Sequence, residues 1–278
     1  MNYKQTYLKP FGVLIEPTSK DRHINDVSIE ILRNLFHDNQ LIVLRNFTTF
    51  NNKDDFSNYC QLWGEISIWP FGKVLELTEQ DNPKDHIFDH SYMPLHWDGM
   101  YRKQIPEYQI FHCLKAPKIN QGGRTVFSNT ISALEHASVK QKKLWNNITG
   151  TYQREMEFYH SKTISPVITK HPYKNISVIR YNEPVSIQNE TFINLPDMHF
   201  KDLKDNQLND FHQDLQKTLY DVNHCYAHQW QENDVVIADN FSLLHGREAF
   251  VSKSPRHLQR VQVLSNPPFD NPSLESYK

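Results

Sequence analysis

Short strand-like runs separated by turns dominate the chain and limit its fold more than any other feature. Helical periodicity interrupts them in only four stretches, so strands and helices do not alternate regularly. This pattern argues against a doubly wound parallel sheet. It favours a mainly β fold with flanking helices (α+β), built on an antiparallel jelly roll. The predicted strands are 41–47, 73–77, 107–114, 124–129, 177–182, 234–239 and 258–264, and the predicted helices are 27–36, 53–63, 131–145 and 206–222.

The 278 residues contain no internal repeat, no low-complexity segment and no linker with a shift in composition. We therefore expect a single domain over residues 1–278, with helices near the N-terminus and a helical insertion around 131–222. Within that insertion, residues 131–145 are predicted to form one helix with Thr130 as its N-cap.

Composition excludes several classes of function. Lys and Arg number 30 against 32 for Asp and Glu, so the net charge of −2 indicates neither a nucleic-acid nor an anionic-membrane partner. No segment approaches the roughly 20 apolar residues of a membrane span. The three cysteines form no CxxC pair, which is typical of reduced thiols in a cytoplasmic protein. Neither GxGxxG nor GxxxxGK[ST] occurs, so a nucleotide-binding loop is not supported.

A histidine and a carboxylate two residues apart could bind one metal ion, but with 15 histidines in the chain about one such pair arises by chance. Two pairs occur, His96–Asp98 and His212–Asp214. The second lies in a predicted helix, where residues two apart point about 200° around the axis and cannot grip one ion. The first follows Pro94 in extended sequence. On a strand its Cα atoms would share one face at roughly 6–7 Å, a spacing that suits a metal.

A useful site needs a third ligand from elsewhere in the chain. The best candidate is His245, which follows the predicted strand 234–239 and a turn. Two histidines and one carboxylate leave coordination positions open, which selects non-haem Fe(II) and oxygen chemistry over structural zinc. From these residues alone, a hydrogen-bonded histidine at the rim of the fold stays the alternative for His245.

Three motifs, HWDGMY (96–101), QGGRTVFSNT (121–130) and DVVIADNFSLLHGREAFVSKSPRHLQRV (234–261), together resemble the TauD/TfdA family. These are Fe(II)/2-oxoglutarate-dependent oxygenases that use O2 and have a double-stranded β-helix core. The motifs come in the family's order with similar separations, and the resemblance extends over nearly the whole chain. It implies the same fold, the same cosubstrates and an enzymatic function.

The resemblance also implies roles for single residues. His96, Asp98 and His245 would hold the iron. Thr125 matches the threonine that contacts 2-oxoglutarate, and Arg256, eleven residues beyond His245, matches the arginine that binds its distal carboxylate. An arginine suits this role because its planar guanidinium gives a carboxylate two parallel hydrogen bonds.

A second arginine, Arg260, matches a family residue that faces the acidic group of the substrate. Arg256 and Arg260 are four apart on a predicted strand, so both should face one side, about 13 Å apart. Tyr101 and Tyr92 are close enough in sequence to the iron ligands to line the substrate pocket, although each could equally belong to the core. Trp97 should point away from its two neighbours and be buried.

Within the family, residues 69–77, 85–113 and 178–184 resemble the isonitrile-pathway oxygenases of PvcB type. The expected substrate is a small molecule with an aromatic ring and a carboxylate, the isonitrile derived from an aromatic amino acid such as tyrosine. The expected reaction is desaturation, with or without loss of the carboxylate. A TauD-like hydroxylase of another small carboxylate or sulfonate is the alternative enzyme. A non-catalytic jelly-roll protein that binds a metal is the alternative from another class.

Overall fold

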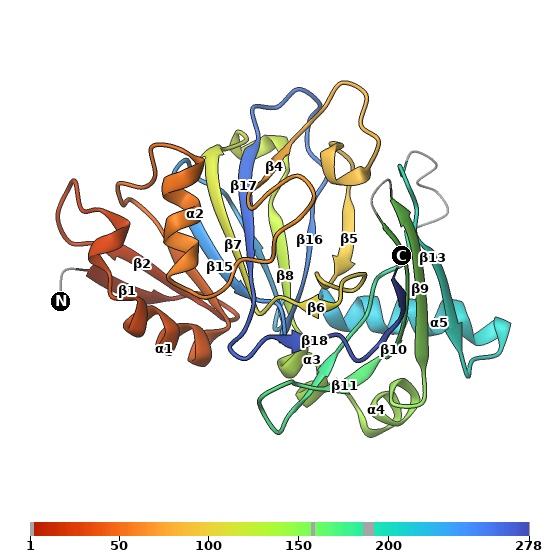
Figure 1. Ribbon diagram of the computed structural model, residues 1–278. Coiled ribbons are helices and arrows are strands. Elements are labelled where there is room, and N and C mark those ends of the chain that lie inside the picture. Colours follow the sequence, from red (N-terminus) through yellow and green to blue (C-terminus); the bar gives the residue numbers. More distant parts are fainter. Residues whose placement is uncertain (1–2, 157–158, 186–191, 278) are drawn as a thin grey trace.

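Two β-sheets that face each other form the centre of the computed structural model, which describes residues 3–156, 159–185 and 192–277 (Figure 1). Within these residues the larger sheet has seven strands in the order β1–β2–β3–β15–β7–β17–β4, and the smaller has four in the order β14–β8–β16–β5. Most neighbours are antiparallel and distant in sequence, which confirms the jelly-roll prediction. Their bounds are β1 (Tyr3–Tyr7), β2 (Val13–Pro17), β3 (Leu41–Leu44), β15 (Val235–Asp239), β7 (Tyr108–Lys115), β17 (His257–Val263), β4 (Leu75–Thr78), β14 (Cys225–His228), β8 (Thr125–Asn129), β16 (Leu243–Arg247) and β5 (Met93–His96).

Alternate residues of each strand fill the space between the two sheets, as strand geometry requires. On β7, Phe111 faces the smaller sheet, whereas its neighbour Ile110 packs on the opposite side. The ring of Phe111 meets that of Phe127 on β8 with 6.4 Å between centroids. On β16, Leu243 joins the same inner cluster, and two residues later His245 faces the same interior. The interior is therefore apolar at one end and polar at the other.

Two amphipathic helices, α1 (Ile29–Asn39) and α2 (Lys53–Gln61), cover the outer face of the larger sheet, at the left of Figure 1. They bury Phe36 and Phe56, respectively, against that face. Asn52 caps α2 as an N-cap asparagine should, by accepting a hydrogen bond from a backbone amide of the first turn. Both helices were predicted from the sequence, α1 from its apolar spacing and α2 from its capping residues and the stop at Gly64. Among the described residues, no helix has the length and apolar character that crossing a membrane requires.

A third layer lies against the other face of the smaller sheet, at the right of Figure 1. It consists of a further four-stranded sheet in the order β13–β9–β10–β19 and of helix α5. Leu95 of β5 and Leu244 of β16 share one core cluster with Tyr152 of β9 and Phe211 of α5. The smaller sheet is thus enclosed on both faces. The elements of this layer are β13 (Asp197–Lys201), β9 (Thr149–Met156), β10 (Tyr159–Pro166), β19 (Leu274–Tyr277) and α5 (Asp205–Leu219).

Residues 131–222, predicted as a helical insertion, contain strands as well as helices. Strand β9 has the sequence TGTYQREM, which is mostly polar, and Tyr152 is its large apolar side chain in the core. Such a strand carries little apolar alternation, so its sequence alone did not reveal it. The other short α-helices and strands are α3 (Thr130–His136), α4 (Val139–Trp145), β11 (Ile168–Lys170), β12 (Ser177–Ile179), β6 (Gln104–Ile105) and β18 (Phe269–Asp270), and the 3-10 helices are η1 (Ile24–Asp26), η2 (His86–Phe88) and η3 (Ile119–Gln121).

The single helix predicted over 131–145 is wrong, because the chain breaks it into α3 and α4. Ala137 is extended, with ψ 140°. Ser138 then accepts a hydrogen bond from the Gln141 amide, and the Gln141 side chain accepts one from the Ser138 amide. This reciprocal capping box starts a new helix. Asn129, one residue before the predicted cap Thr130, is the N-cap of α3.

Candidate metal centre and substrate cavity

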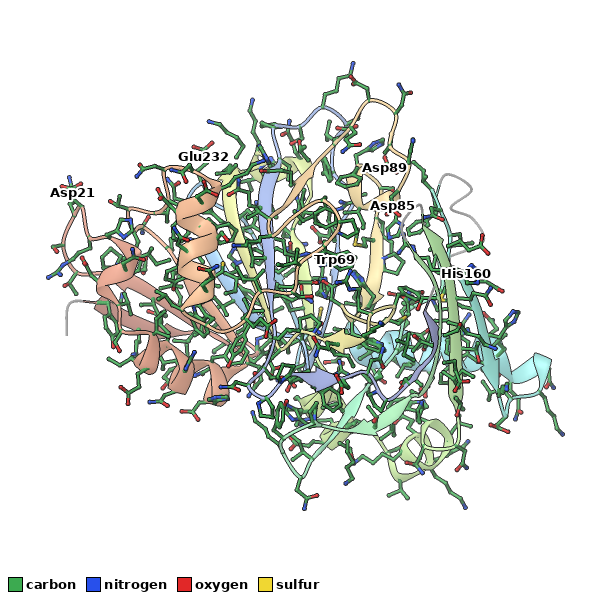
Figure 2. All side chains as sticks on the ribbon, in the orientation of Figure 1. Asp21, Trp69, Asp85, Asp89, His160 and Glu232 are labelled. Atoms are coloured by element: carbon green, nitrogen blue, oxygen red, sulfur yellow. The ribbon has the colours of Figure 1, made fainter. Side chains whose placement is uncertain are left out.

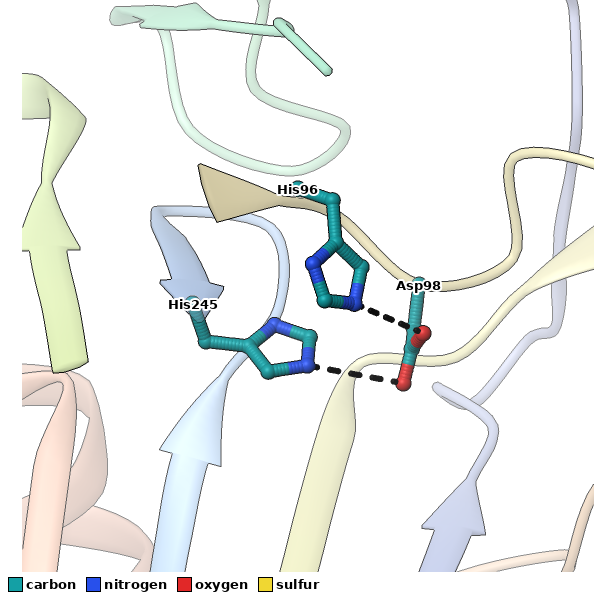
Figure 3. Close-up of side chains that lie close together, drawn as sticks. All are labelled: His96, Asp98 and His245. Carbon is teal, nitrogen blue, oxygen red and sulfur yellow. Dashed lines mark ion pairs between the residues drawn. The ribbon is translucent and has the colours of Figure 1, made fainter. Parts of the chain in front are cut away.

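Three side chains meet between the two central sheets: His96 at the end of β5, Asp98 just beyond it, and His245 on β16 (Figure 3). His96 and His245 are direct partners in the antiparallel pairing of β5 with β16. Their Nε2 atoms lie 3.8 and 3.9 Å from the Asp98 carboxylate oxygens, and one ligand atom from each residue lies within 4.8 Å of the others. The structure therefore brings together the three residues predicted as metal ligands.

The prediction that Asp98 continues the strand of His96 is wrong. β5 ends at His96, and Asp98 opens a turn. Gly99 in this turn has φ +87°, and a Cβ there would lie 2.6 Å from Cδ of Pro106. A left-handed conformation in such a tight space requires glycine. The turn, not a shared strand face, carries the Asp98 carboxylate back toward both histidines.

Both imidazoles are neutral, and a backbone contact also sets the tautomer of His96 for binding a metal through Nε2. Nδ1 of His96 lies 2.9 Å from the Pro94 carbonyl, so that nitrogen donates and Nε2 is left as the acceptor facing Asp98. Nδ1 of His245 lies 3.4 Å from the amide nitrogen of Gln109. Burial lowers the pKa of His96 and lowers the pKa of His245 well below its usual value. Both rings are therefore neutral near pH 7, as metal ligation requires.

Asp98 is held as a carboxylate by two residues of β17. Nη1 of Arg260 and Nε2 of Gln262 each donate to Oδ2 of Asp98 at 2.6 Å. Burial by itself would raise the pKa of Asp98, but the charge of Arg260 and the other neighbours outweighs it and lowers that pKa. The group is thus ionised, and the site contains one carboxylate and two neutral imidazoles.

A cavity of about 200 Å³ opens beside the three residues. Its lining includes the aromatic and apolar side chains Trp69, Phe88, Phe192 and Met198. Trp69 lies near the centre of the view in Figure 2, and Asp85, which also lines the cavity, lies above it beside β5. A mostly apolar wall with a few polar groups is the usual construction of a small-molecule site.

The two residues predicted to contact 2-oxoglutarate, Arg256 and Thr125, both line this cavity and are buried. Nε of Arg256 donates to the Gly123 carbonyl at 3.0 Å, and Oγ1 of Thr125 accepts from the Trp230 indole at 3.0 Å. Burial lowers the pKa of Arg256 to about 9, and no carboxylate pairs with it among the described residues. A buried cation of this kind offers an anion a strong binding partner.

Gly123 explains part of the QGGRT motif. It has φ +78°, and a Cβ on it would lie 3.0 Å from Cδ of Arg256. Glycine therefore both adopts the left-handed turn and leaves room for the guanidinium to reach the cavity.

The predicted substrate residues do not all lie in the cavity. Tyr101 lines it and is buried. Tyr92 is absent from the lining and instead donates to Glu183 at 3.1 Å, beside the hydroxyl of Tyr220, the residue that follows α5. The structure thus corrects the expectation for Tyr92, because its side chain turns toward α5. Trp97 is buried in the outer core, as predicted.

Sequence reasoning missed several polar residues of the cavity wall, among them Arg247, Arg154 and His86. Arg247, two residues after His245 on β16, donates to the backbone carbonyls of residues 86, 87 and 91. Its spacing from His245 could have indicated the shared strand face. Arg154 on β9 and His86 also line the cavity, with Nη2 of Arg154 3.3 Å from Nδ1 of His86. Both come from segments whose approach to β5 no local pattern revealed.

Comparison with known proteins agrees with this geometry. The model of the family described as "Taurine catabolism dioxygenase TauD, TfdA family" matches residues 6–262. The chain belongs to this family. As a TauD/TfdA protein it is an Fe(II)/2-oxoglutarate-dependent oxygenase, which confirms the predicted enzyme class.

Within the TauD/TfdA family, the chain is similar to two proteins named tyrosine isonitrile desaturase. It is 45% identical to the one from Erwinia amylovora over 95% of this chain and 90% of that protein. It is 41% identical to the one from Pseudomonas aeruginosa over 95% of this chain and 91% of that protein. A Fischerella ambigua protein named 3-((Z)-2-isocyanoethenyl)-1H-indole synthase is 38% identical over 92% of this chain and 94% of its own length.

A solved structure of PvcB, described as an Fe, alpha-ketoglutarate dependent oxygenase from an isonitrile synthetic pathway, has a TM-score of 0.86 with this chain. The two are 37% identical, and the match covers 99% of this chain and 97% of PvcB. A taurine dioxygenase from Burkholderia xenovorans, 14% identical, has a TM-score of 0.72, which shows a shared fold. These neighbours confirm the double-stranded β-helix core.

Proposed function

We propose that this oxygenase desaturates the isonitrile derivative of an aromatic amino acid, with tyrosine isonitrile as the first candidate. The observation that carries the proposal is the His96–Asp98–His245 cluster, open to an aromatic-lined cavity in a chain so similar to two tyrosine isonitrile desaturases. Desaturation would consume one 2-oxoglutarate and one O2 and yield succinate, CO2 and water, while the substrate loses two hydrogen atoms. If the substrate carboxylate leaves as well, a second CO2 is released and only one hydrogen is lost from carbon.

The three clustered residues fit a ferrous ion. Two neutral imidazoles and one carboxylate on one side of an ion are the ligand set of non-haem iron oxygenases, and they leave the cavity side open. Bound iron, together with 2-oxoglutarate and O2, would supply the oxidation of a substrate C–H bond. The chain supplies the ligands in their metal-binding protonation states, through the Pro94 carbonyl at His96 and through Arg260 and Gln262 at Asp98.

Arg256 and Thr125 would hold 2-oxoglutarate. The guanidinium of Arg256 would bind the distal carboxylate through charge-assisted hydrogen bonds, which relieves the cost of a buried, unpaired cation. The Thr125 hydroxyl already accepts from Trp230, so its own hydrogen is left to donate to a carboxylate oxygen.

The isonitrile group carries no net charge and the carboxylate is ionised, so the substrate is an anion. We place its carboxylate toward Arg260, whose Nη1 bonds Asp98 while the guanidinium keeps further N–H groups. The aromatic ring would lie against the apolar wall with Tyr101, which leaves the benzylic C–H near the iron. Tyr92 has no part in this arrangement.

The test is to incubate the protein with Fe(II), 2-oxoglutarate, O2 and tyrosine isonitrile, and to measure succinate and product mass. A product two hydrogens lighter, with or without loss of CO2, supports the proposal, and His96→Ala should abolish it. His199→Ala is the matched control, because His199 is exposed on β13 away from the cavity. A product heavier by one oxygen would indicate hydroxylation, and absence of substrate-dependent succinate would refute the proposal.

A further inference from the structure

Asp98 is the metal-site residue that regular secondary structure does not hold. His96 and His245 lie on paired strands, but Asp98 lies in a turn after β5 ends. Its backbone N–H and C=O must still be satisfied, because buried peptide groups without partners are costly. The position of its carboxylate therefore depends on whatever binds that backbone.

The side-chain amide of Asn240 binds both groups. The Asp98 N–H donates to Oδ1 of Asn240 at 2.9 Å, and Nδ2 of Asn240 donates to the Asp98 carbonyl at 2.9 Å. This two-bond ring reproduces the pairing of residues on antiparallel strands. The Asn240 side chain thus holds the backbone of Asp98, as pairing with β16 holds the backbone of His96.

The rest of the amide is also occupied. Nδ2 of Asn240 donates to the Pro106 carbonyl at 2.8 Å, and Oδ1 accepts from Gln109 at 2.9 Å. All four hydrogen-bonding positions of the amide are filled. Because its partners include one backbone N–H and two backbone carbonyls, the orientation of the amide is determined.

Asn240 is itself rigidly placed. It is 1% exposed, and its backbone N–H donates to the Glu107 carbonyl at 2.8 Å. Nη1 of Arg180 donates to the Asn240 carbonyl at 2.7 Å. Five residues later on the same segment comes His245, whose Nδ1 lies 3.4 Å from the Gln109 amide that Asn240 holds.

We propose that Asn240 is the positioning residue of the metal site: its amide sets the Asp98 carboxylate in register with the two histidines, and so determines metal affinity. The inference rests on the proposed iron site. Asn240 would not touch the metal. Residues that orient metal ligands typically change metal affinity by about 10–100-fold when they are removed.

The chain offers a stringent control in Asn271. It is buried too, and its Nδ2 donates to the carbonyls of Gly99, Met100 and Arg102 at 3.3, 2.9 and 3.1 Å. Asn271 therefore supports the same turn without bonding Asp98. Comparing variants of Asn271 and Asn240 therefore separates stabilisation of the turn from positioning of the Asp98 carboxylate.

The experiment measures Co(II) and anaerobic Fe(II) binding to metal-free protein by calorimetry and by the Co(II) visible spectrum, with Tm recorded for each variant. Asn240→Ala and the isosteric Asn240→Asp, which loses both donors, should raise the metal Kd about 10–100-fold and alter the Co(II) spectrum. Asn271→Ala should lower Tm while leaving the Kd within about threefold of wild type.

A folded Asn240 variant with wild-type Kd, or an equal loss of affinity in Asn271→Ala, would overturn the inference. Hydrogen exchange of the wild-type protein covers the case in which neither Asn240 variant folds. The Asp98 amide should then be protected although it lies in a turn, and exchange at the rate of an open loop would refute the proposal. If wild-type protein binds no metal, the proposed function itself fails, which is a distinct result.

Discussion

Replacing Arg256 by methionine tests the cosubstrate site most sharply, because the structure predicts opposite effects on binding and on stability. Arg256 is 4% exposed and has no carboxylate partner among the described residues. Burial lowers its pKa from 12.5 to about 9. At 1.36 kcal/mol per pKa unit, that difference corresponds to roughly 5 kcal/mol for keeping the guanidinium charged without an anion.

A bound 2-oxoglutarate would relieve this cost through two charge-assisted hydrogen bonds, each worth about 1.5–3 kcal/mol. Since 1.4 kcal/mol is a tenfold change, Arg256→Met should raise the KM for 2-oxoglutarate at least about 100-fold. In the absence of 2-oxoglutarate the same change removes an unpaired buried charge. It also removes the bond to the Gly123 carbonyl, so the net gain in the free energy of unfolding should be well below 5 kcal/mol.

The assays are succinate formation at varied 2-oxoglutarate and thermal unfolding with and without it. We expect a higher KM, a Tm for the unliganded variant that is at least as high as that of wild type, and loss of the stabilisation that 2-oxoglutarate gives. Arg124→Met is the matched control, since Arg124 pairs with Glu248 on the exposed surface. An unchanged KM would refute the assignment of Arg256 to the 2-oxoglutarate site, and a lower Tm of the unliganded variant would refute the argument from its buried charge.

Two further predictions concern the turn beside Arg256 and a buried carboxyl group. Gly123→Ala should raise the KM for 2-oxoglutarate roughly tenfold and lower Tm, because a Cβ would lie 3.0 Å from Cδ of Arg256 and φ is +78°. Succinate formation at varied 2-oxoglutarate and thermal unfolding measure the two quantities, and wild-type values would count against the steric argument. Burial and then Asp239 raise the pKa of Glu107 from 4.5 to about 7, so the folded state binds the proton more tightly and stability is lost as pH rises from 4.5 through 7. Glu107→Gln should reduce the loss of unfolding free energy between pH 5 and pH 8 by up to about 3 kcal/mol. The Tm of both proteins over this pH range measures the effect, and parallel Tm curves would contradict the prediction.

Much of the fold could be predicted because strands and helices with one buried face leave a periodic pattern in the sequence. The apolar run of β3 and the amphipathic spacing of α1 and α5 are of this kind. β9 could not be found in this way, because it is polar and is held mainly by pairing with β10 and β13. The break at Ala137 was missed because continuous helical spacing obscured the capping box that follows it.

The candidate site could be predicted in its residue types but not in its geometry. The choice of His96–Asp98 over His212–Asp214 followed from helix geometry, and the structure does place His212 on α5, where it bonds Tyr181. Tyr92 was expected in the pocket from nearness in sequence alone. Glu183, 91 residues further along the chain, bonds its hydroxyl instead and turns it toward α5.

By itself, the sequence determined which groups could take part: a carboxylate, two imidazoles and a pair of arginines, of which His96, His245 and Arg260 lie on strands. Those choices are local, because side-chain chemistry and the period of two are properties of a few consecutive residues. Only the tertiary structure decided that Asp98 stands in a turn, that Arg260 neutralises it and that Asn240 holds its backbone. These contacts join residues more than 140 positions apart, and such pairings exist only once the two sheets have closed on each other.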